Sequence, residues 1–232
     1  MKRVFTINKM GEASNKIVHP YRLLVTGRST MGKTTLAVDI IRSKLLKHVR
    51  RCFAVCPTFW SQPALGPLRA IQGAFNQKNV FTEVHDGVFE VIYRILVKKP
   101  APTLIFIDDS SAEKATNIGS KGSFSRLCIS CNHLDTSMVG VFHRLTSASA
   151  SFRDNCEGMI SFIPSKIIDV DVIYKEFNPS PAHAKSLDIV RNALQEAWEN
   201  DRFCFIARES FTGRIYYYSG FNFRIRFHAQ PY

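Results

Sequence analysis

Short apolar runs alternate along the chain with segments of helical periodicity. The runs lie at 21–26, 52–56, 103–107, 136–142 and 158–163. Most of them lack the alternation of apolar and polar positions found in half-exposed strands, which is typical of strands buried on both faces. Apolar side chains recur near three- and four-residue spacing at 33–47 and 87–98, which predicts a helix over each segment. A loop and a further helix are expected within 57–80. This order predicts an α/β fold with a mainly parallel central sheet flanked by helices.

The two ends of the chain depart from this pattern. The predicted division is an N-terminal arm at 1–20, a core at 21–165 and a C-terminal extension at 166–232. The extension is expected to pack on the core, with an amphipathic helix at 182–199 and a hairpin of strands at 203–207 and 214–219.

The net charge of the chain is +12, from 31 Lys and Arg against 19 Asp and Glu. Such an excess favours a polyanionic partner. Basic residues concentrate at 42–51 and again at 202–226. Two interpretations stay open for these segments, a solvated basic surface or a track for a nucleic-acid phosphate backbone. Aromatic residues alternate with arginines near the C-terminus, which favours strand patterning over a base-stacking surface. A surface that docks onto a capsid or a neighbouring subunit is a third interpretation of this segment.

No run of 18 or more apolar residues occurs, so no membrane span is expected, and the basic N-terminus lacks the apolar stretch of a signal peptide. The six cysteines are scattered along a core-rich chain, which favours a reducing intracellular compartment over a disulfide scaffold. Cys128 and Cys131 form a C-x-x-C pair, but no second pair follows to complete a set of four zinc ligands. Structural thiols are therefore favoured over zinc or redox chemistry.

The segment Gly27–Thr34 matches the P-loop pattern G-x-x-x-x-G-K-[ST] between a predicted strand and a predicted helix. Glycines let such a backbone curl around a phosphate, with its N–H groups and the positive end of the helix turned inward. Lys33 would reach the β- and γ-phosphates, and the Thr34 hydroxyl would take a Mg²⁺ position. The candidate nucleotide-binding residues are Gly27, Arg28, Ser29, Thr30, Met31, Gly32, Lys33, Thr34 and Thr35. The alternative is an ordinary glycine-rich loop with a solvated lysine.

The apolar run that starts at Thr103 ends in two carboxylates, Asp108 and Asp109. After a P-loop, this is the expected form of a Walker B element. Asp108 would hold Mg²⁺ directly or through water, and Asp109 would orient or deprotonate the attacking water. Many such ATPases carry Glu in the second position, and Asp is one methylene shorter. The alternative is a pair of solvated acids at a strand end. The sequence thus predicts ATP and Mg²⁺ as cofactors, with Thr34 and Asp108 as metal ligands.

Three further segments resemble, in this order, the genome-packaging ATPases of poxviruses, giant viruses and virophages, which belong to the FtsK/HerA superfamily of P-loop motors. They are Cys56–Gln62, Asn132–His143 and Phe152–Asn155, and the resemblance extends from about Leu23 to Ile163. The family shows a Pro-Thr pair after its second strand, an Arg-His pair, a strand that ends in a polar sensor, and an Arg-x-Asn. Here Asn132 replaces the Arg of the Arg-His pair, and His143 stands where Gln is usual.

The resemblance implies an ATP-hydrolysing motor that translocates double-stranded DNA, regardless of its sequence, into a viral capsid. It implies a homo-oligomeric ring, a pentamer or hexamer, at the capsid vertex, in the virion or in the cytoplasm or nucleus of an infected cell. His143 would then contact the γ-phosphate, and Arg153 would be an arginine finger supplied to the neighbouring subunit. Competing interpretations of Arg153 are a salt bridge to Asp154 or Glu157, with Arg126 or Arg144 as the finger.

Two alternatives remain from other functional classes. One is a P-loop kinase that phosphorylates a small molecule or nucleoside, and the other is an ATP-dependent assembly switch that moves no DNA. DNA should stimulate a motor, whereas it would leave the ATPase rate of a kinase unchanged. The assembly switch would bind nucleotide and change its oligomeric state.

Overall fold

The computed structural model describes residues 5–6, 17, 19–71, 73–108, 122–164, 172, 205–209, 215–218 and 226–227. The predicted catalytic acid Asp109 and the predicted helix at 182–199 lie outside the described residues. The division into arm, core and extension stays a prediction.

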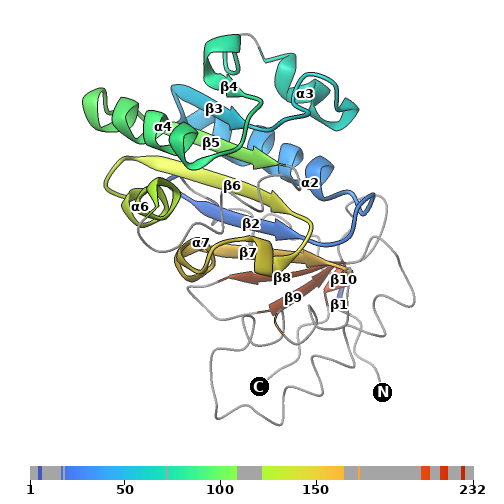
Figure 1. The fold of residues 1–232 in the computed structure, drawn as a ribbon. Helices are drawn as coiled ribbons and strands as arrows, with labels where there is room; N and C mark the ends of the chain where they lie inside the picture. Colours follow the sequence, from blue (N-terminus) through green and yellow to red (C-terminus); the bar gives the residue numbers. More distant parts are fainter. Residues whose placement is uncertain are drawn as a thin grey trace.

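An eight-stranded sheet with the order β4-β3-β5-β6-β2-β7-β8-β9 forms the centre of the molecule (Figure 1). Its strands are β2 (Arg22–Thr26), β3 (Arg51–Val55), β4 (Val80–Phe81), β5 (Thr103–Asp108), β6 (Thr136–Phe142), β7 (Gly158–Phe162), β8 (Phe205–Glu209) and β9 (Ile215–Tyr218). The strands from β4 to β7 in this order pair in parallel, which confirms the predicted mainly parallel sheet.

The antiparallel strands β8 and β9 continue this sheet beyond β7. The sequence predicted them as a hairpin, and it did not predict that the hairpin joins the central sheet. A separate two-stranded ladder pairs β1 (Phe5–Thr6) with β10 (Arg226–Phe227), two segments far apart in the sequence (Figure 1).

Helices cover both faces of the parallel strands (Figure 1). Helices α2 (Lys33–Ile40) and α3 (Gly66–Arg69) contribute to one apolar cluster, and α4 (Asp86–Lys98), α6 (Ser123–Ser130) and α7 (Ala150–Asn155) contribute to the other. Along β3, Cys52 and Ala54 face the first cluster, while Phe53 and Val55 face the second. Because both faces are covered, the strands carry apolar residues at nearly every position. None of the described helices has the length and apolarity needed to cross a bilayer.

The helix predicted over 33–47 does extend that far, but its hydrogen bonding changes after Ile40. A π-helical turn (η1, Ile41–Leu45) and a 3₁₀ turn (η2, Leu46–His48) follow α2. Within η1, the Ser43 hydroxyl donates to the Asp39 carbonyl (2.7 Å), a type of bond that competes with the backbone ladder and bends helices. Ile41 and Leu45 both remain fully buried, so the apolar face still packs toward the sheet.

Strand β6 lies between β2 and β5, although it follows both in the sequence. Its register pairs Leu23 with Val139 on one side and Ile105 with Met138 on the other. Parallel strands present their carboxyl ends at one edge of a sheet, and ligands of open α/β folds bind there. The loop after β2, the end of β5 and the residue after β6 therefore meet at the same edge.

Gly27, directly after β2, is required by the close approach of β7. Its φ is +139°, and a Cβ placed on it would lie 2.6 Å from the Phe162 Cβ. Gly32 has φ +82°, but a Cβ there would meet no atom within 4 Å. The first glycine therefore has both a steric and a conformational requirement, whereas the second has only a conformational one.

We expect Gly27→Ala to lower the free energy of unfolding by about 2–4 kcal/mol, because it adds backbone strain and a clash at the end of β7. The matched variant Gly32→Ala should lower it by about 1 kcal/mol, the cost of the left-handed conformation alone. Urea denaturation of both variants measures the difference. Equal losses would contradict the packing of β7 against the start of the loop.

Candidate nucleotide site

The loop between β2 and α2 has a backbone suited to hold an anion. Gly27, Thr30 and Gly32 have positive φ angles of 139°, 65° and 82°. Left-handed residues set among right-handed ones, as at Thr30 and Gly32, turn neighbouring N–H groups toward one side, which is the geometry of an anion-binding nest. Thr30 is β-branched, so its left-handed conformation is strained, as is often seen where backbone geometry serves a function. Within the described part of the chain, no side-chain hydrogen bond caps α2, which leaves its first turn to interact with a bound anion.

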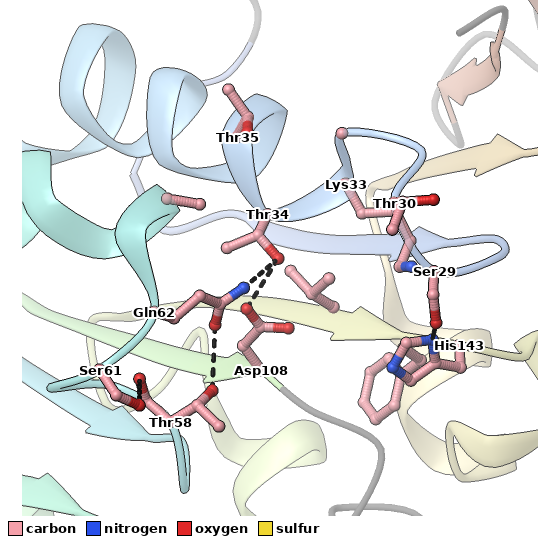
Figure 2. A pocket seen from close by; sticks show the side chains of 14 residues that line it. Ser29, Thr30, Lys33, Thr34, Thr35, Thr58, Ser61, Gln62, Asp108 and His143 are labelled. Carbon is pink, nitrogen blue, oxygen red and sulfur yellow. Dashed lines mark hydrogen bonds between the residues drawn. The ribbon is translucent and has the colours of Figure 1, made fainter. Parts of the chain in front are cut away.

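A cavity of about 630 Å³ opens at the carboxyl edge of the sheet, within the size range of small-molecule sites. Figure 2 shows side chains from the P-loop, the segment after β3, and the ends of β5 and β6 converging on it. Its lining residues are Ser29, Thr30, Gly32, Lys33, Thr34, Thr35, Thr58, Ser61, Gln62, Ala64, Asp108, Val141, Phe142 and His143. Of the predicted loop residues, Gly27, Arg28 and Met31 are outside this lining.

Lys33 lies almost buried at the start of α2, with an exposed fraction of 6%. Its Nζ donates to the Arg28 carbonyl across the loop at 2.6 Å. Burial lowers the pKa of Lys33 to about 8, and the nearby Asp108 carboxylate only partly offsets this shift. The ammonium group is thus held in a poorly hydrated position where an anionic ligand would stabilise its charge.

Thr34 and Asp108 lie together, as the predicted metal site requires. The Thr34 hydroxyl donates to Asp108 Oδ2 at 2.9 Å, and Asp108 is 5% exposed at the end of β5. A hydroxyl oxygen and a carboxylate oxygen are hard ligands, and Mg²⁺ is commonly held by one or two such protein oxygens together with phosphates and water. The donor set therefore fits Mg²⁺.

The segment after β3 contributes two side chains to the same cluster (Figure 2). Thr58 donates its hydroxyl to Gln62 Oε1 (3.0 Å), and Gln62 Nε2 donates to Thr34 Oγ1 (3.3 Å). The sequence placed Thr58 in a family motif but did not predict a role for Gln62. The sequence did contain one signal for such a role. Gln62 follows a predicted buried strand closely, and the carboxyl ends of these strands form the edge of the sheet where ligands bind.

His143 directly follows β6 and lies beside the P-loop (Figure 2). Its Nδ1 is 3.2 Å from Ser29 Oγ, and its ring lines the cavity. The insertion of β6 between β2 and β5 brings it there. The structure therefore places the predicted sensor residue next to the predicted phosphate loop, although its role stays a prediction.

Arg153 lies on α7 and is not among the residues that line the cavity. Its Nη1 donates to the Ala148 carbonyl at 2.5 Å. Glu157, one of the partners considered for Arg153, instead forms a buried ion pair with Arg22. Another candidate finger, Arg126, donates to Glu90 (2.6 Å) and lies over the Tyr93 ring.

The cysteines of the C-x-x-C pair are core residues. Cys128 and Cys131 are fully buried on and after α6, where the Arg22 guanidinium donates to the Cys128 carbonyl (3.0 Å). Burial raises the pKa of the Cys131 thiol to about 12, so it stays protonated, and it donates to the Leu127 carbonyl. Metal ligation needs the thiolate, so these features favour structural thiols. The described residues include no metal-binding cluster of His, Cys, Asp or Glu.

No protein-family model matches the chain, and no curated protein matches it significantly. Among solved structures, it is similar to B204, the DNA-packaging ATPase from Sulfolobus turreted icosahedral virus, with a TM-score of 0.63 and 11% identity over 88% of this chain and 99% of that chain. It is also similar to the genome packaging NTPase B204 from Sulfolobus turreted icosahedral virus 2 in complex with AMPPCP, with a TM-score of 0.60 and 12% identity over 87% and 98% of the two chains.

The same viral NTPase in complex with ATP-gammaS gives a TM-score of 0.56 at 13% identity, over 87% and 97% of the two chains. At these identities the similarity concerns the fold, which is that of a P-loop NTPase. The resemblance to viral genome-packaging ATPases that the sequence suggested is confirmed at that level.

We expect the affinity for ATP to fall about tenfold between pH 8 and pH 9.5. The pKa of Lys33 is about 8, so its ammonium loses its proton over this range, and binding of a phosphate chain must then restore it. Isothermal titration calorimetry across this range measures the change. In Lys33→Arg the charge persists at all these pH values, so its affinity should vary little. An equal decline in both proteins would contradict the assignment to Lys33.

Proposed function

We propose that this chain is an ATP-hydrolysing motor that translocates double-stranded DNA into a viral capsid. The observation that carries the proposal is the meeting of the P-loop, the Thr34–Asp108 pair and His143 at one cavity. Similarity of the whole fold to viral packaging NTPases, two of them in complex with ATP analogues, supports both ATP as the nucleotide and packaging as the task.

Each of the predicted binding and catalytic residues has a separate task in this proposal. Lys33 and the N–H groups of the loop bind the β- and γ-phosphates, and Thr34 and Asp108 hold Mg²⁺. When bound, Mg²⁺ neutralises charge that develops on the phosphate oxygens. Asp109, the residue after Asp108, orients the attacking water and accepts its proton. His143 donates a hydrogen bond to the γ-phosphate, which requires an N–H on the cavity side of its ring.

Arg153 supplies the remaining positive charge in this proposal. Its helix α7 lies outside the cavity lining, which supports action on the site of a neighbouring subunit instead of its own. A planar guanidinium is suited to stabilise charge on the γ-phosphoryl group during transfer. This arrangement requires a homo-oligomeric ring, a pentamer or hexamer. We place that ring at the capsid vertex, in the virion or the infected cell.

A basic surface lies at the amino ends of β3 and β5, on the edge of the sheet opposite the cavity. Its members are Lys47, His48, Arg50, Arg51, Lys98 and Lys99. The Arg50 N–H bonds the Pro102 carbonyl (2.8 Å) and Arg51 Nη1 bonds the Lys99 carbonyl (3.0 Å), which join the two segments. Within the described part of the chain, these residues form no ion pair with Asp or Glu. Unneutralised charge of this density suits a phosphate backbone, and we assign DNA to it.

The proposal predicts that double-stranded DNA stimulates ATP hydrolysis severalfold, with little dependence on DNA sequence and a steep loss as salt rises. Lys33→Ala should abolish hydrolysis with and without DNA, because the phosphate ligand is lost. Steady-state ATPase assays with random-sequence duplexes measure both effects. ATP hydrolysis that DNA does not alter would contradict the motor and leave the kinase or the assembly switch.

Charge reversal provides the control for where DNA binds. Lys47→Glu and Arg50→Glu should each weaken DNA binding and lower the salt slope by about 1 for every DNA phosphate that the side chain no longer neutralises. Lys78→Glu makes the same charge change at an exposed position in η4 (Gln77–Asn79) and should have a smaller effect. Equal effects of all three variants would mean that only net charge matters, and the basic surface would not be where DNA binds.

A further inference from the structure

We infer that Gln62 is a positioning residue that couples metal binding at Thr34 to the turn that carries Trp60. Among the described residues, Gln62 is the side chain whose amide joins the segment after β3 to the predicted metal ligand. The inference rests on the proposed function, because it concerns the Mg²⁺ that would accompany the nucleotide.

The hydrogen-bond directions around Gln62 follow from the chemistry of its partners. Asp108 as a carboxylate only accepts, so the single hydroxyl hydrogen of Thr34 is committed to it (2.9 Å). Thr34 Oγ1 can therefore only accept from Gln62, which must present its NH₂ group there (3.3 Å). The Thr58 hydroxyl donates to the opposite end of the amide (3.0 Å). The two hydrogen bonds thus define a single orientation of the Gln62 amide, with its nitrogen toward Thr34 and its oxygen toward Thr58.

This orientation conflicts with a cation on the Thr34 oxygen. A hydroxyl oxygen has two lone pairs, so space alone does not exclude a metal ligand beside an N–H donor. The amide N–H nevertheless directs the positive end of its dipole at the same oxygen, and a dipole in this orientation repels a cation at short range in a partly buried site. Binding of Mg²⁺ at Thr34 should therefore displace the Gln62 amide, and the amide in turn should oppose the metal.

The turn that holds Gln62 is arranged to carry this change outward. The Gln62 N–H bonds the Thr58 carbonyl (2.9 Å), so the segment forms one helical turn. Thr58 and Gln62, four residues apart, face the cavity, whereas Trp60 between them is 46% exposed. Trp60 packs edge-on against the buried Phe59 ring, with centroids 5.2 Å apart.

Arg69 fixes the backbone of the same turn. Its Nη1 donates to the Phe59 carbonyl (2.6 Å) and to the Gln62 carbonyl (2.8 Å). The main chain is thus held at two points around Trp60. Because one guanidinium nitrogen holds both carbonyls, a backbone shift at Gln62 is shared with Phe59 and with Trp60 between them. Displacement of the Gln62 amide, which breaks its bonds to Thr34 and Thr58, is therefore expected to alter the surroundings of the Trp60 indole.

Fluorescence of Trp60 tests the inference. The chain has two tryptophans, so the Trp198→Phe background leaves Trp60 as the reporter. We expect AMPPCP with MgCl₂ to change the Trp60 emission, and AMPPCP with EDTA to change it much less. Gln62→Met keeps the length of the side chain but removes the donor. It should abolish the Mg²⁺-dependent change and increase the affinity for Mg²⁺·AMPPCP about fivefold, the value of one lost competing hydrogen bond.

Gln77→Met, the same substitution at an exposed position of η4, is the matched control and should behave as the parent protein. The inference is overturned if Gln62→Met retains both the parent emission change and the parent affinity.

Titration calorimetry of the parent distinguishes failure of the inference from failure of the proposed function. If the parent binds AMPPCP tightly only with Mg²⁺ and Gln62→Met is unaltered, the inference alone fails. If the parent binds no AMPPCP, the inference and the proposed function fail together.

Discussion

The hydrogen bond from Thr34 to Asp108 joins the first turn of α2 to the carboxyl end of β5, and the candidate site depends on it. It connects two residues that are 74 positions apart in the sequence. It also places a hydroxyl and a carboxylate oxygen in the cavity that Lys33 lines. Burial depresses the pKa of Lys33, because holding its charge away from water has a free-energy cost. A cavity with this charge pattern suits a phosphate chain with its divalent cation better than a neutral ligand.

The parallel sheet makes this convergence possible. Every parallel strand ends at the same edge, so β2, β3, β5 and β6 each deliver one part of the site. The position of β6 between β2 and β5 matters for His143, because it brings the Nδ1 atom of this residue to 3.2 Å from Ser29 Oγ. Gly27 then allows β7 to approach the start of the loop, because even a Cβ at this position would clash with Phe162. The opposite edge carries the basic surface, so the proposed sites for nucleotide and for DNA lie at the two ends of one sheet.

The sequence predicted those parts of the structure that depend on local pattern. The P-loop is a contiguous motif, and buried strands such as β5 and β6 show as apolar runs, so both could be identified without tertiary information. Helix α7 has only six residues and β4 only two, too few to show a period. The role of Gln62 could not be predicted, because it arises from two bonds across separate elements, to Thr34 and Thr58. Asp109 lies outside the described residues and remains a prediction from the motif alone.

A crystal structure with AMPPCP and Mg²⁺ would locate both ligands relative to the P-loop. We expect the β-phosphate within the loop from Gly27 to Lys33, the cation against Thr34 Oγ1 on the side of Asp108, and the Gln62 amide displaced from Thr34. A nucleotide bound elsewhere, or a cation away from both Thr34 and Asp108, would contradict the proposed site.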